Sequence, residues 1–202
     1  MIHIVTGANA DRYSAEMLQA YELRHRVFVE EKGWAALRRP DSREIDQFDD
    51  EYAVHMLYIE AGAVLGYQRL LPTTRPYLLT EIYPQLCDGP PPGAADIWEW
   101  TRFCVAPARR DHGRERSPIA HALLTGIVEW GLCAGVSAIV IEMDPGWLVR
   151  LVQLHFKVTP LGLPLPVEGE ETVAVIAHFD RRTLDRLTLM RPPAFGQSER
   201  AA

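Results

Sequence analysis

Six charged residues stand in apolar or aromatic stretches of the sequence, where an ionised side chain is costly unless it has a partner. They are Arg24, Asp46, Asp49, Arg69, Glu99 and Arg102. Carboxylates and guanidinium groups held in such surroundings can move a proton or bind a charged small molecule. We therefore predict that the six residues, although far apart in the chain, converge on one cleft.

Arg24 shares the apolar face of a predicted helix with Phe28. An arginine there either lays its aliphatic stem on the core and reaches water, or is buried against a carboxylate. The loop that follows supplies Asp46 and Asp49, which can pair with Arg24 or bind a cationic ligand, unless the loop is simply solvated. Trp34 precedes this loop and offers a large flat surface, which is core packing in the plainest interpretation.

Glu99 and Arg102 belong to the segment WEWTRF, which predicts a strand. Alternate residues of a strand face opposite sides, so a regular strand would send these two side chains to different faces. A β-bulge would aim both at one site, and bulges are common beside active sites. The alternative is a structural ion pair across strands. Arg69 interrupts a second apolar strand, GYQRLLP.

The order of predicted elements indicates an α/β (α+β) fold. A hairpin turning at Ala61-Gly62 and strands alternating with helices favour a three-layer sandwich, with a central, mostly antiparallel, twisted sheet flanked by helices. We expect one domain over 1–202, with a mobile tail over 192–202. The pattern predicts strands over 2–5, 53–60, 64–71, 97–105, 137–143, 155–159 and 172–179, and helices over 14–32, 80–86, 117–134, 147–154 and 181–189.

Composition narrows the class of protein. Hydrophobic residues make up 48% of the chain, enough for a core, and the formal net charge is −6. That balance argues against a nucleic-acid partner, and the absence of a long apolar run argues against membrane insertion. The start of the chain lacks the pattern of a signal peptide, and three widely spaced cysteines suit reduced thiols. We expect a cytoplasmic protein without a metal site.

Taken together, the motifs resemble the LuxI-type N-acyl-homoserine lactone (autoinducer) synthases. The string RHRVFVEEKGW, with Arg24, Phe28 and Trp34, is similar to the N-terminal signature of that family. The segments EIDQFDD, GYQRLLPTTRPYLL and WEWTRFCV are similar to its acidic loop, its arginine-bearing strand and its glutamate–arginine strand. The resemblance is strong over 21–134 and looser elsewhere.

The resemblance implies a fold like that of the GNAT acetyltransferases and an enzyme that acylates S-adenosylmethionine, closes a lactone and releases methylthioadenosine for quorum sensing. S-adenosylmethionine and the acyl thioester are substrates, and no cofactor is implied. Glu99 would be the general base, acting directly or through water, and Arg102 would hold it ionised. The residues expected to contact substrate are Phe28, Trp34, Tyr83, Thr101, Phe103, Met143, Trp147 and Phe156.

The acyl donor is the least constrained part of the hypothesis. Arg109, Arg110 and Gly113 resemble part of the pyrophosphate loop of the acetyltransferases, but Glu115 stands where a small residue belongs. The region expected to line the acyl pocket has few basic residues to dock an acidic acyl carrier protein, and it has several bulky side chains that would shorten the pocket. These features favour a short, branched or aromatic acyl group on coenzyme A over a long chain on acyl carrier protein. The alternatives are a GNAT-type N-acetyltransferase that uses acetyl-coenzyme A, and a non-catalytic small-ligand binding domain.

Overall fold

The computed structural model describes residues 1–110 and 117–191. The predicted mobile tail over 192–202, and Gly113 of the predicted phosphate loop, lie outside these residues.

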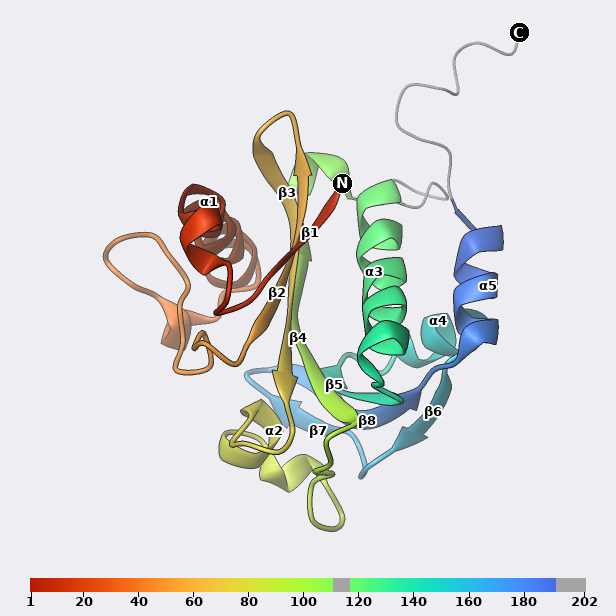
Figure 1. Ribbon diagram of the computed structural model, residues 1–202. Helices are drawn as coiled ribbons and strands as arrows, with labels where there is room; N and C mark the ends of the chain where they lie inside the picture. Colours follow the sequence, from red (N-terminus) through yellow and green to blue (C-terminus); the bar gives the residue numbers. More distant parts are fainter. Residues whose placement is uncertain (111–116, 192–202) are drawn as a thin grey trace, which may run out of the picture.

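An eight-stranded twisted sheet forms the centre of the molecule (Figure 1). Its order is β1-β2-β3-β4-β5-β8-β6, with β7 paired to β8, and only β4 and β5 run parallel. The predicted mostly antiparallel sheet is thus confirmed. The strands are β1 (Ile2–Val5), β2 (Val54–Glu60), β3 (Ala63–Pro72), β4 (Ile97–Val105), β5 (Ala138–Met143), β6 (Lys157–Pro160), β7 (Leu165–Val167) and β8 (Glu170–His178).

Helices cover both faces of the sheet, as the predicted three-layer sandwich requires. Helix α1 (Ser14–Arg24) lies on one face, and α3 (Pro118–Ala134) and α5 (Arg181–Leu189) lie on the other (Figure 1). The side chain of Ser117 caps α3 by accepting a hydrogen bond from the Ala120 amide. The shorter helices are α2 (Leu78–Glu81) and α4 (Trp147–Gln153). No helix in 1–110 or 117–191 has the length and apolar character needed to cross a bilayer.

The sheet opens between β4 and β5. Their pairing runs only from Ile97↔Ala138 to Glu99↔Val140, and the strands then separate. Just beyond that point β4 carries the predicted bulge: the β3–β4 register shifts between Tyr67 and Arg69, and Arg102 has a left-handed backbone (φ 56°). The split leaves room for a ligand between the two strands.

Two predicted elements were wrong in detail, and one strand was missed. The first helix does not continue as an α-helix to 32: after Arg24 it becomes a π-helix over His25–Glu31, where the Lys32 amide donates to the carbonyl of Val27. The helix over 80–86 is two pieces, α2 and a 3-10 turn (Pro84–Leu86), because Pro84 cannot continue an α-helix. The short strand β7 was not predicted.

Candidate active site

Three arginines and three carboxylates pack into one buried group behind the opening of the sheet. We name it the arginine–carboxylate cluster, and its members are Arg24, Arg69, Arg102, Glu44, Asp46 and Asp49. Their formal charges balance. Five of the six were predicted to converge, and Glu44 is the addition.

Arg24 is completely buried, so the interpretation in which its head reaches water was wrong. Its Nε lies 2.5 Å from Glu44, and its two terminal nitrogens donate to the two oxygens of Asp49 at 2.7 and 2.9 Å. A planar guanidinium that meets carboxylates along two edges is fixed in position. The end of α1 is thereby tied to the acidic loop.

Arg69 is also completely buried, on β3. Its terminal nitrogens donate to both oxygens of Asp46 at 2.6 and 2.9 Å, and one of them also donates to Asp49 at 2.8 Å. Its Nε donates to the Thr101 hydroxyl at 3.1 Å. Burial alone would raise the pKa of both aspartates, but the neighbouring arginines outweigh burial and lower each pKa, so both stay ionised.

Arg102 does not hold Glu99, contrary to the sequence-based expectation. Its guanidinium donates to Glu44 at 3.1 and 3.3 Å and to Asp46 at 2.9 Å. The bulge explains the difference, because the left-handed backbone at position 102 turns this side chain towards the acidic loop.

Glu99 lies beside the cluster and is completely buried on β4. Its two oxygens accept hydrogen bonds from the amides of Leu79 and Leu78, at 2.7 and 2.9 Å, at the start of α2. Its side chain is also hydrogen-bonded to that of Glu142 on β5. Burial raises the pKa of Glu99 to about 7, although the amides and Arg69 favour its ionised form. A carboxyl group that titrates near neutral pH suits a general base.

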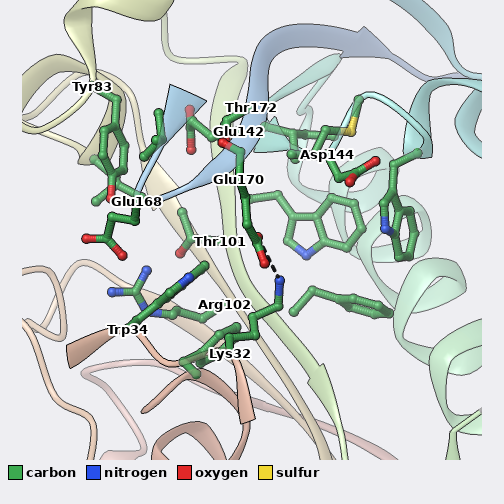
Figure 2. Close-up of a pocket in the computed structure, with 18 residues that line it drawn as sticks. Lys32, Trp34, Tyr83, Thr101, Arg102, Glu142, Asp144, Glu168, Glu170 and Thr172 are labelled. Carbon is green, nitrogen blue, oxygen red and sulfur yellow. Dashed lines mark hydrogen bonds and ion pairs between the residues drawn. The ribbon is translucent and has the colours of Figure 1, made fainter. Parts of the chain in front are cut away.

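A pocket of about 270 Å³ fills the opening between β4 and β5 (Figure 2). Of the residues predicted to contact substrate, seven line it: Phe28, Trp34, Tyr83, Thr101, Phe103, Met143 and Trp147. Phe156 does not, because it is buried in the core against Phe179. Arg102 is the one member of the arginine–carboxylate cluster among the described lining residues, and the other five lie behind this wall, as does Glu99.

The two ends of the pocket differ in chemistry. At one end Phe28 and Trp34 stack with their ring centroids 5.0 Å apart, and the Arg102 guanidinium lies over both rings. Lys32 joins Glu170 at 3.4 Å beside them (Figure 2). At the other end Phe103 meets Trp147 edge to face, with Met143 also on the wall. One end therefore suits a flat, charged ligand and the other an apolar group.

The predicted phosphate-binding arginines are engaged within the protein. Arg109 pairs with Glu60 at 2.5 Å, and Arg110 pairs with Glu31 at 2.7 Å and donates to the Val105 carbonyl. Neither is among the residues that line the pocket.

Two carboxyl groups of the site, those of Glu44 and Glu142, were not identified from the sequence. Glu44 stands in the polar run SREID, where nothing marks it as buried. Glu142 stands in the buried strand sequence IVIEM, and the criterion that selected Glu99, a charge within an apolar strand, would have selected it too.

A split sheet with an apolar groove and buried carboxyl groups beside it is the arrangement expected of an acyl-transferring enzyme of GNAT-like fold. A putative N-acetyltransferase from Lactobacillus plantarum shares this fold, with a TM-score of 0.55 at 21% identity over 88% of this chain and 99% of its own.

Closer similarities identify the family. Residues 8–187 match the family model described as autoinducer synthase. The isovaleryl-homoserine lactone synthase of Bradyrhizobium diazoefficiens is 39% identical over 93% of this chain and 84% of its own. The structure of BjaI, a coenzyme A-dependent acyl-homoserine lactone synthase with S-adenosylmethionine and isopentyl-CoA, superposes with a TM-score of 0.87 at 39% identity, covering 93% of this chain and 87% of that one.

The chain belongs to the autoinducer synthase family and is an acyl-homoserine-lactone synthase. Such an enzyme joins an acyl group to S-adenosylmethionine, forms the lactone and releases methylthioadenosine, and the product serves quorum sensing. The rival sequence interpretations, an acetyltransferase and a non-catalytic binding domain, are thereby set aside.

Proposed function

We propose that this synthase takes a short, branched acyl group from coenzyme A. The observation that carries the proposal is the bulky wall at the apolar end of the pocket, where Phe103, Trp147 and Met143 line the cavity and would limit the length of an acyl chain. The coenzyme A dependence of BjaI and the isovaleryl product of the Bradyrhizobium relative support the same choice. Both substrates are made in the cytoplasm, and we expect the enzyme to work there.

S-adenosylmethionine would occupy the charged end. The stacked pair of Phe28 and Trp34 offers a flat face to the adenosyl group. Asp46 keeps 14% of its side chain exposed, more than the other carboxylates of the arginine–carboxylate cluster, and can neutralise the ammonium or sulfonium charge. The rest of the cluster would hold Asp46 and Arg102 in fixed positions, which limits reorganisation during the reaction.

The first step is attack of the substrate amine on the acyl thioester, which forms the amide and expels the thiol. An ammonium group cannot attack, so a base must first take its proton. Glu99 is our candidate. Because it is completely buried behind the pocket wall, we propose that the proton reaches it through a water molecule beside Thr101. Backbone N–H groups of β4 and β5, beyond the point where the two strands separate, can stabilise the tetrahedral oxyanion.

The second step is attack of the carboxylate of the methionyl part on its own γ-carbon, which closes the lactone and expels methylthioadenosine. Sulfonium is a good leaving group, so this step mainly needs a bent substrate. The walls formed by Phe28, Trp34 and Tyr83 can hold that conformation.

The test uses purified protein, S-adenosylmethionine and matched acyl groups carried on coenzyme A and on acyl carrier protein, with mass spectrometry for lactone and methylthioadenosine. We expect the highest kcat/KM for a short branched acyl-coenzyme A. Trp147→Ala should shift the preference towards longer chains, with Val149→Ala, an exposed position of α4, as the matched control. A clear preference for a long chain on the carrier protein would contradict the proposal.

A further inference from the structure

Glu142 is a half-buried acidic group for which the reaction described above has no use. It lies on β5, two residues beyond Val140, which is the register partner of Glu99 on β4. Its side chain borders the pocket (Figure 2). A side-chain hydrogen bond joins it to Glu99 on the neighbouring strand.

Two carboxyl groups can form a hydrogen bond only when one of them carries a proton, since an ionised carboxylate has no donor. Two backbone amides already donate to Glu99, which favours its ionised form. The Oε1 atom of Glu142 is buried, and within 1–110 and 117–191 no group donates a hydrogen bond to it. The proton of the pair is therefore best placed on Glu142.

We propose that Glu142 is a positioning residue that keeps one proton and donates it to Glu99, so that Glu99 remains an ionised base at neutral pH. This inference rests on the proposed role of Glu99 as general base. Burial and the neighbouring Glu99 raise the pKa of Glu142 well above its usual range, which agrees with a neutral, donating carboxyl group.

Other groups around the pair do not take over this role. Arg69 faces Glu99 from β3, but its guanidinium is bound by Asp46, Asp49 and Thr101. Arg102 faces Glu142 from β4, but it is held by Glu44 and Asp46. Among the described residues, Tyr77, Tyr83 and Cys87, on or beside the segments around α2, also lie near Glu142, and burial raises the pKa of each, so they stay neutral. Asp144, Glu168, Glu170 and Lys32 line the same pocket as Glu142.

The test is the pH profile of kcat/KM for three substitutions of Glu142 and its partner. Glu142→Leu removes the donor, so Glu99 should hold its own proton more tightly and the acid limb of the profile should move up by about one pH unit. Glu142→Gln keeps an N–H donor without a titrating proton and should return the limb close to that of the wild type. The substrate amine titrates identically in every variant, so differences between profiles report the enzyme.

Glu129→Leu, an exposed position on α3, is the charge control and should leave the profile unchanged. Thermal melting checks that each variant is folded. The inference is overturned if Glu142→Leu lowers the plateau without moving the limb, or if Glu142→Gln moves it as far as Glu142→Leu does. Glu99→Gln, measured in parallel, distinguishes failure of the proposed base from failure of the inference about Glu142. Full turnover in Glu99→Gln would show that Glu99 is not the base. Lost turnover in Glu99→Gln, together with an unmoved acid limb in Glu142→Leu, would show that only the proposed role of Glu142 is wrong.

Discussion

Glu99 combines burial, two backbone donors and a carboxyl neighbour, and this combination brings its pKa to about 7. We predict that Glu99→Gln lowers turnover by about two orders of magnitude or more, the usual contribution of a general base, while the protein stays folded. The measurement is single-turnover formation of lactone with saturating S-adenosylmethionine. Near-normal turnover in this variant would remove Glu99 from the base role.

Arg24 meets Glu44 and Asp49 along two edges of its guanidinium, with no access to solvent. Arg24→Ala should lower the free energy of unfolding by about 3–5 kcal/mol, because it takes one of the two guanidinium partners away from each of two buried carboxylates, and it should also lower activity. Chemical denaturation measures the change. Arg182→Ala, at an exposed position on α5, is the control. Equal stability of the two variants would count against a structural ion network.

For individual residues, the sequence predicted much of the site. Arg24, Arg69 and Glu99 each interrupt an apolar pattern, and that criterion works because burial of a lone charge is so costly. It fails for Glu44, whose neighbours in the chain are polar, so only the folded loop reveals that Arg24 and Arg102 share it. The sequence also cannot decide which guanidinium meets which carboxylate, because that depends on distances set by three separate elements.

The active site lies where strands β4 and β5 separate. Strand β3 pairs with β4 and supports it, and Gly66 on β3 lets helix α3 approach the sheet closely. A Cβ atom at Gly66 would lie 2.6 Å from Ile119 Cγ2 and 3.0 Å from Leu123 Cδ1. This contact is tighter than side chains tolerate without a shift of the helix.

We therefore predict that Gly66→Ala lowers the free energy of unfolding by about 1–3 kcal/mol, the usual range for overpacking. Gly89→Ala is the matched control, since a Cβ atom there meets nothing within 4 Å. Urea denaturation of both variants measures the effect. A Gly66→Ala protein as stable as the control would mean that α3 is free to move away from the sheet.

The sequence predicts helices and strands well where the hydrophobic periodicity and the residues that begin or end an element agree. The strand over 97–105 and the capped helix after Ser117 are found where expected. The π-helix after Arg24 could not be predicted, because α-helical and π-helical turns are formed by the same residue types. They differ only in which carbonyl accepts the hydrogen bond from each amide. The bulge at Arg102 was inferred from the need to aim Glu99 and Arg102 together, and the structure has it, but it turns the arginine to the acidic loop instead. That detail depends on where the loop packs.

Across the whole molecule, two sets of buried carboxyl groups oppose each other in their dependence on pH. Asp46 and Asp49 face arginines, and their pKa values lie below the usual range. Stability from these groups is present above their unfolded-state pKa and is lost as the pH falls through the folded-state pKa. Glu99 and Glu142 lie next to each other, and burial raises the pKa of both. Their contribution has the reverse sign: it is complete below the unfolded-state pKa and is lost as the pH rises.

Removing the Glu99 carboxyl should therefore make the enzyme relatively more stable at alkaline pH while it lowers turnover. The pKa of Glu99 rises from the ordinary 4.5 to about 7 on folding, so the relative gain for Glu99→Gln should grow by roughly 3 kcal/mol between pH 4 and pH 8. Apart from Glu142, whose pKa is raised in part by Glu99, the other titrating groups are common to both proteins and largely cancel in the difference. Urea denaturation of wild type and Glu99→Gln at pH 4.5, 6 and 8 measures this trend. A difference that stays constant over that range would show that Glu99 is ionised with equal ease in the folded and unfolded chain, and the stability cost of a buried base would then not exist in this protein.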